Sequence, residues 1–359
     1  MNPPSLVPVP EAIPAPYWLF ILLENALFLV HIVLVNLVVG GSLLALFSRG
    51  ANSQSPVRPL AGLVGGRIPL FLPIAINVGI APLLFLQVVF GHFFYTSSVL
   101  MAVYWILVIP LLILAYYGAY YYARRQEKTP RLARWILGVT TLIFLYIGFM
   151  LVNNLTLMME PERWIAYFEN RGGTFLNLDD PMVAPRYLHF VLASVAIAGL
   201  YAAWIADRRI KQGQTDHGPL KRRGLRIFGW ASLAQLAVGS WFLLALPSPI
   251  VRSFMGRDMG KSLILLLGVL VGIGAAVSAF RGKLRPTIIQ LAVTMIAMII
   301  TRDQLRALYL KPHFEPSSLS LNPQYGVLVL FLVVLVAGLA TVAYMLRLAF
   351  ARSIHGGAQ

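Results

Sequence analysis

Residues 17–48 read YWLFILLENALFLVHIVLVNLVVGGSLLALFS, an apolar run that contains one acidic residue, Glu24, and one histidine, His31. A bilayer core of roughly 30 Å is crossed by about 20 apolar residues in a helix. The run is long enough to span a membrane. Its apolar residues are continuous instead of alternating with a period of two, which excludes a strand of a membrane barrel. It therefore predicts a transmembrane helix.

Eight further apolar runs follow the same pattern. The chain is 58% hydrophobic and only 12% charged over its 359 residues, which lies outside the range of soluble domains. The sequence thus predicts an all-α integral membrane protein, built as a single bundle of nine transmembrane helices. The expected spans are 17–48, 68–95, 98–122, 135–158, 187–206, 227–246, 262–280, 286–301 and 326–350.

Basic residues collect on one side of the predicted bundle. The loops after the odd-numbered spans, with the end of the chain, hold 20 of the 29 basic residues, whereas the other side holds 9 basic and 9 acidic residues. Because positive loops stay in the cytoplasm, we expect a periplasmic N-terminus and a cytoplasmic C-terminus in a bacterial inner membrane. The net charge of +16 is then a topology signal. It indicates anionic membrane lipid as a partner and no nucleic acid.

One bundle accounts for most of the chain. We expect a Pro-rich outer tail over 1–16, the transmembrane bundle over 17–350 and a cytoplasmic tail over 351–359. The longer outer loops are expected at 159–186, 247–261 and 302–325. The chain has no cysteine, which excludes disulfides, iron–sulfur clusters, thiolate haem ligation and covalent c-type haem. No signature of a soluble enzyme is present, so no catalytic residue is predicted.

Three of the six histidines lie within predicted spans: His31 in the first, His92 in the second and His189 in the fifth. Aromatic and small residues surround them, and b-type haem requires an imidazole nitrogen for its iron and room for a flat macrocycle. The alternative is a histidine bonded to a neighbouring helix, with the small residues serving close helix packing. Both interpretations remain open for each histidine.

Met259 begins the seventh span at the same depth as His189. Histidine and methionine on two helices form a reasonable axial pair for a haem iron, with Arg252 and Arg257 near enough to bind propionates. The alternative for Met259 is gap filling in the loop or core.

Glu24 is the one acidic residue well inside a predicted span. Two turns before His31, it could relay protons, bind a quinone or orient the His31 imidazole, or it could simply lie at the membrane interface. At the outer end of the eighth span, Arg302, Asp303 and Arg306 are expected to form a snorkelling cluster or a local ion pair.

Together these residues resemble the haem-bearing subunit I of cytochrome bd-type quinol oxidases, a distant likeness over most of the chain. The matching features are His31 followed by Gly40-Gly41, Ile76-Asn77 leading to Phe90-Gly91, Asp180-Pro181 before Tyr187-Leu188-His189-Phe190, and Arg257-Asp258-Met259. The resemblance implies a nine-helix fold in which His189 and Met259 ligate one b haem. It also implies a first-helix ligand at His31. His92 has no counterpart in the family and could replace a lost ligand.

The chain also departs from the family. Gln87 stands where the family has the glutamate of its oxygen-reducing site, and only Leu246 to Lys261 replace the long quinol-binding loop. These departures argue against an oxygen reductase. They favour a membrane subunit with one or two b haems that transfers electrons within a quinol-linked respiratory complex. Arg252, Arg257, Glu24 and Gln87 would lie near haem propionates or quinone.

The expected partners are other redox subunits, such as a multihaem cytochrome c, and quinol or quinone. Whether the chain forms part of a quinol-dependent oxidoreductase stays open. Two alternatives also remain. One is a haem-free scaffold that binds quinone, lipid or another subunit; the less favoured one is a transporter, for which the sequence shows no inverted repeat.

Overall fold

The computed structural model describes residues 7–50 and 61–355, a part of the chain that is mostly helical, with one isolated β-bridge between Ile13 and Leu321. The elements are α1 (Tyr17–Gly50), η2 (Ala61–Gly65), α3 (Ile68–Leu100), α4 (Ala102–Arg125), α5 (Pro130–Met158), η3 (Pro161–Phe168), α6 (Val183–Lys211), η4 (Thr215–His217), α7 (Gly218–Ala245), α8 (Ser248–Arg252), η5 (Ser253–Arg257), α9 (Met259–Phe280), α10 (Leu284–Leu310), η6 (Pro316–Ser318) and α11 (Tyr325–His355).

Among the described residues, eight helices are long and apolar enough to cross a membrane by their length and composition: α1, α3, α4, α5, α6, α7, α9 and α10. The expected all-helical architecture is confirmed, and it is consistent with a multi-pass membrane protein. The ninth expected span, 326–350, falls in α11, whose described apolar stretch is the shorter Tyr325–Gly338. Residues 1–6 and 356–359 of the two expected tails lie outside the described part.

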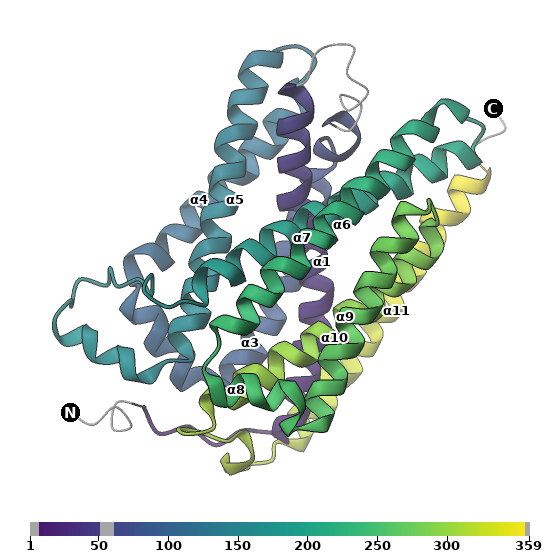
Figure 1. Cartoon of the computed structure of the whole chain (residues 1–359). Coiled ribbons are helices and arrows are strands. Elements are labelled where there is room, and N and C mark those ends of the chain that lie inside the picture. The colour runs from purple at the N-terminus through teal and green to yellow at the C-terminus, as the bar shows by residue number, and fades with distance from the viewer. Residues whose placement is uncertain (1–6, 51–60, 356–359) are drawn as a thin grey trace.

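The connections gather at two ends of the bundle (Figure 1). The N-terminal segment, the α5–α6 connection, α8 and the segment before α11 lie at one end, and the α4–α5 and α6–α7 turns lie at the other. We name the first the acidic end, after Glu160 and Asp180, and the second the basic end, after Arg124 and Arg209.

The helices pair as antiparallel neighbours. α6 packs along α7, α9 along α10, and α4 along α5, while α1 contacts both α3 and α6. Small residues allow this close approach, as is typical of membrane helices. A Cβ atom on Gly224 of α7 would lie 2.5 Å from the carbonyl oxygen of Gly199 on α6, so this crossing requires glycine.

A second close crossing joins α1 to α6. A Cβ atom on Gly40 would lie 1.8 Å from the carbonyl oxygen of Ser194, and the Ser194 hydroxyl donates to Asn36 Oδ1 at 2.8 Å. The small residues that follow His31 and His189 in the sequence therefore pack against each other. At the α1–α6 crossing these small residues allow close helix packing, which is the alternative to providing room for a haem macrocycle.

α10 continues well beyond the expected span 286–301, to Leu310. Arg302, Asp303 and Arg306 were expected in the loop 302–325, and they lie instead on the last turns of this helix. α6 likewise begins at Val183, inside the expected loop 159–186. The helix can continue through these charged residues because Arg302 and Arg306 bind Glu24 of α1 and Asp303 pairs with Arg306.

Candidate functional site

Glu24 of α1 lies at the centre of a buried ion cluster. Glu24 is only 3% exposed. Its two carboxylate oxygens accept hydrogen bonds from Arg306, one from Nη1 at 2.7 Å and one from Nη2 at 2.9 Å. Arg302 Nη2 donates to the same carboxylate at 2.9 Å. Arg306 also pairs with Asp303. We name Glu24, Arg302, Asp303 and Arg306 the Glu24 cluster.

The Glu24 cluster is balanced in charge, with two carboxylates and two guanidinium groups. A buried charge costs several kcal/mol unless a partner of opposite sign and hydrogen bonds compensate it. The paired, bidentate geometry between Glu24 and Arg306 supplies this compensation. The cluster thus fastens the first turns of α1 to the last turns of α10.

This pairing was only half expected. The local Arg306–Asp303 pair is present, but no local pattern indicated that Glu24, 282 positions away on another helix, would complete it. One signal was available. Glu24 lies near the start of the first span and Arg306 follows the end of the eighth, so antiparallel spans bring both to the same depth.

Aromatic rings connect the Glu24 cluster to two of the histidines. The Arg302 guanidinium carbon lies 4.0 Å from the Phe28 ring centroid, and Phe28 is 6.3 Å from the His31 ring. The Arg306 carbon lies 4.3 Å from the Phe90 centroid, and the Phe90 and His92 rings both contact Phe314. Both guanidinium groups therefore combine ion pairing with a cation–π contact.

His31 is held between α1 and α3. Its Nδ1 lies 2.9 Å from the carbonyl oxygen of Ala75, and its ring lies against Gly79, where a Cβ atom would be 2.4 Å from Cε1. With Nδ1 donating to the carbonyl, a neutral imidazole keeps its lone pair on Nε2, the arrangement that second-sphere carbonyls impose on metal-binding histidines. Because the Glu24 carboxylate binds arginines, it does not orient His31.

His92 follows a break in α3, where Phe90 leaves helical geometry with φ −120° and ψ 22°. The His92 ring lies 4.4 Å from the Phe93 ring and 4.6 Å from the Phe314 ring, between centroids. Its Nε2 is buried and has no hydrogen-bond partner. Aromatic packing therefore encloses this imidazole.

His189 belongs to α6, and its ring lies close to α7. Its Nδ1 is buried without a hydrogen-bond partner, and a Cβ atom on Gly239 of α7 would lie 3.8 Å from that nitrogen. Gln235 of α7 donates to the His189 carbonyl oxygen at 3.2 Å. A buried polar atom without a partner costs about 1–3 kcal/mol, so this nitrogen is the kind of atom that a ligand or metal would satisfy.

The expected partners of His189 are exposed. Met259 begins α9 with 66% of its surface exposed, and in the described part of the chain no hydrogen bond or ring contact joins it to His189. Their helices α6 and α9 both pack on α7. Arg252 and Arg257 are also exposed, and Arg252 Nε donates only to the Ser248 carbonyl oxygen of its own helix, at 3.3 Å.

Arg186, which the sequence analysis did not select, lies three residues before His189. Its guanidinium carbon is 5.5 Å from the Phe242 ring centroid of α7, and it interacts electrostatically with both Asp180 and Arg302. It therefore places a positive charge within electrostatic range of the Glu24 cluster, one helical turn from His189 along α6. Its i−3 spacing from His189, on the same helical face, was the signal that could have identified it.

Gln87, the residue at the position of the family's glutamate, accepts at Oε1 from the Tyr95 hydroxyl at 3.3 Å. Both residues belong to α3. The contact gives this amide a neutral partner within its own helix, and it places no charged group beside it.

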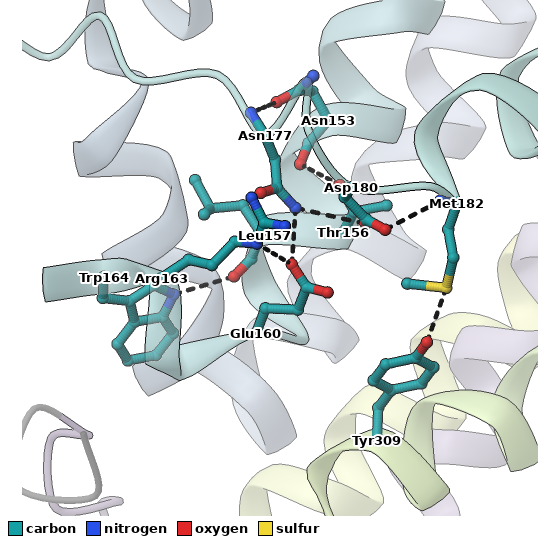
Figure 2. Close-up of polar contacts among 10 residues, drawn as sticks. All are labelled: Asn153, Thr156, Leu157, Glu160, Arg163, Trp164, Asn177, Asp180, Met182 and Tyr309. Atoms are coloured by element: carbon teal, nitrogen blue, oxygen red, sulfur yellow. Dashed lines mark hydrogen bonds and ion pairs between the residues drawn. The ribbon is translucent and has the colours of Figure 1, made fainter. Parts of the chain in front are cut away.

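The α5–α6 connection closes the acidic end through the polar network of Figure 2. Asn153 Oδ1 accepts from the Asn177 backbone N–H at 2.7 Å, and Asn177 Nδ2 donates to Glu160 at 3.0 Å and to Asp180 at 3.4 Å. Asp180 Oδ1 in turn accepts from the Met182 N–H at 2.9 Å, at the start of α6. The loop is thus fixed on both flanking helices.

Burial raises the pKa of the Glu160 carboxyl above its ordinary value, although Asn177 and Arg163 act in the opposite direction. Burial likewise raises the pKa of Asp180, against the hydrogen bond from Met182. A second link reaches α10, where the Tyr309 hydroxyl donates to Met182 Sδ at 2.8 Å. The network therefore ends close to the helix that carries Arg302 and Arg306.

Comparisons with protein-family models, with curated proteins and with solved structures found no match for this chain. Within residues 7–50 and 61–355, no group of three or more histidine, aspartate or glutamate side chains has the arrangement of a metal site. The site must therefore be interpreted from its own residues. The residues to interpret are the Glu24 cluster, the cation Arg186, and the three imidazoles, which no described hydrogen bond or ring contact joins to one another.

Proposed function

We propose that this chain is a membrane-embedded electron-transfer subunit with b-type haem, part of a quinol-linked respiratory complex in a bacterial inner membrane. In this proposal all nine expected helices span the membrane, with the N-terminus and the acidic end outside. The observation that carries the proposal is the buried, unpartnered Nδ1 of His189 beside Gly239. Such an atom costs free energy that an axial bond or a ligand contact would recover.

The residues fit a haem group in part. His189, with Met259 from α9, would hold one iron, and His31 is the better second ligand because its Nδ1 is already bound to the Ala75 carbonyl. His92 is less suited, since Phe93 and Phe314 enclose its ring. When bound, haem supplies a one-electron redox centre whose potential depends on its axial ligands.

The chain's own positive charges would orient the propionates of such a group. Arg186 lies one helical turn from His189, so we add it to the exposed Arg252 and Arg257 as a propionate partner. The ion pairs of the Glu24 cluster would then hold α1 and α10 together beside the haem site. Quinol, quinone and a multihaem cytochrome c remain the proposed redox partners.

Haem content of the purified chain tests this proposal. We expect the detergent-solubilised protein to contain at least one b haem per chain by the pyridine haemochrome assay. His189→Ala should remove a low-spin haem, whereas His217→Ala, at the basic end beside Asp216 and Arg209, should leave the haem content unchanged. Equal haem in all three proteins would remove His189 as a ligand.

A haem-free scaffold is the second candidate. Two observations favour it: the Glu24 cluster is charge-balanced without any ligand, and the small residues after His31 and His189 are used in helix packing. It predicts a colourless protein, after expression with sufficient haem supply, that copurifies with partner subunits. A transporter is supported by no described contact and would require solute flux in proteoliposomes.

A further inference from the structure

A groove opens between α1, α6 and α7 towards the basic end of the bundle, away from the Glu24 cluster. Its volume is about 610 Å³, and its walls are almost entirely apolar. The residues that line it are Leu44 of α1, Leu192 and Val195 of α6, and Arg223, Arg226, Ile227, Trp230 and Ala231 of α7.

The α7 residues form one stripe along the helix. Arg223, Arg226, Ile227 and Trp230 follow each other at intervals of three, one and three positions, which places them on one face. At a rise of about 1.5 Å per residue, the two arginines lie nearest the start of α7 at Gly218. Arg223 and Arg226 therefore form the end of the groove nearest the basic end, which we call its mouth. The apolar lining residues extend from there towards the middle of the bundle.

The two arginines have no acidic partner among the residues that the structure describes. Arg223 Nη1 is buried without a hydrogen-bond acceptor, and neither arginine forms an ion pair with any described residue. The nearby acidic residue of α6, Asp207, is already engaged by Lys211 at 2.8 Å and by Lys221 at 2.7 Å. The mouth of the groove thus carries positive charge that the described chain does not neutralise.

We propose that this groove binds one anionic phospholipid, with its phosphate on Arg223 and Arg226 and an acyl chain along the apolar wall. A guanidinium group binds phosphate oxygens in a bidentate manner, and basic pockets between membrane helices bind anionic head groups. Trp230, 66% exposed, has the amphipathic character of residues at the lipid head-group level. The apolar wall distinguishes this site from one for free phosphate.

A lipid with a zwitterionic head group would satisfy the phosphate contact but bring a third cation beside the two arginines. We therefore expect phosphatidylglycerol to be preferred over phosphatidylcholine of the same acyl chains. Each arginine contributes about a fivefold preference, since one basic residue near an anionic lipid surface contributes about 1 kcal/mol. The two together predict about a 30-fold preference.

Native mass spectrometry of the delipidated full chain, titrated with each lipid, measures this preference. Arg223→Gln/Arg226→Gln should abolish it, whereas Arg222→Gln, a change of the neighbouring exposed arginine that does not line the groove, should keep it. Ala231→Trp should weaken binding of both lipids by filling the wall without changing the charge. Helix content by circular dichroism and elution volume check that each variant is folded.

Equal binding of the two lipids by the wild-type protein would overturn the proposal, and this result needs no variant. An equal loss with Arg222→Gln would also overturn it, because general attraction to the basic end would then explain the preference. Displacement of the lipid by millimolar inorganic phosphate, with no effect of Ala231→Trp, would assign the arginines to free phosphate instead. None of these outcomes depends on whether the chain binds haem.

Discussion

The Glu24 cluster gives the most specific prediction for the stability of this fold. Glu24→Gln keeps the shape of the side chain and removes one negative charge from a group that receives three guanidinium hydrogen bonds of 2.7–2.9 Å. The bond from Arg302 counts less, because that side chain is 28% exposed. The two bonds from Arg306, whose side chain is 8% exposed, lose most of their strength. Removing one partner of a buried ion pair typically costs about 3–5 kcal/mol. We therefore expect Glu24→Gln to lower the free energy of unfolding by about this amount.

A double-mutant cycle measures the interaction itself. Glu24→Gln, Arg306→Gln and the double variant are unfolded in mixed micelles with increasing sodium dodecyl sulfate, and the free energies of unfolding are compared. The double variant restores charge balance, so we expect it to be more stable than the sum of the single losses by about 2 kcal/mol. Glu315→Gln removes an exposed carboxylate 3.9 Å from Lys311 and should cost about 0.5 kcal/mol or less.

Additive losses in this cycle would refute the pairing. So would a Glu24→Gln variant that is as stable as Glu315→Gln, because the carboxylate of Glu24 would then be solvated and not buried against α10. The cycle does not depend on haem, on lipid or on the direction of the chain in the membrane. It therefore tests the structure separately from the function.

Two further predictions concern the acidic end and the α6–α7 crossing. Because burial raises the pKa values of the Glu160 and Asp180 carboxyls, their contribution to stability is present in acid and is lost as the pH rises through those raised values. Relative to Glu160→Gln/Asp180→Asn, the wild type should gain thermal stability as the pH falls from about 7 towards about 4, the ordinary range of these carboxyls in the unfolded chain; parallel melting temperatures would contradict this. Gly224→Ala should cost about 1–3 kcal/mol, since its Cβ meets Gly199. Gly218→Ala, with open space around it, should be near neutral, and equal unfolding curves would refute the crossing.

The positions of the long apolar helices along the chain were largely predictable from the sequence. The expected span 68–95 lies inside α3 and 135–158 inside α5, because continuous apolar residues and Pro at the helix starts are strong local signals. The end of α10 was not predictable in this way. Arg302, Asp303 and Arg306 interrupt the apolar run, and only a tertiary partner, Glu24, explains why the helix continues through them.

The candidate site was predictable in its residue types but not in its geometry. The sequence identified His31, His92 and His189 as unusual, yet it could not show that Phe314 covers His92 or that Ala75 binds His31. These contacts come from segments far apart in the chain. The depth argument that paired His189 with Met259 remains a prediction, since depth alone does not fix which face of α9 points towards α6.

An absorption spectrum of the purified chain, oxidised and then reduced with dithionite, tests the central claim most directly. The proposed function predicts a Soret band that shifts on reduction, with the sharp visible bands of a low-spin b haem that disappear in His189→Ala. A spectrum with no Soret band, from protein expressed with ample haem and shown to be folded by its helix content, would contradict it.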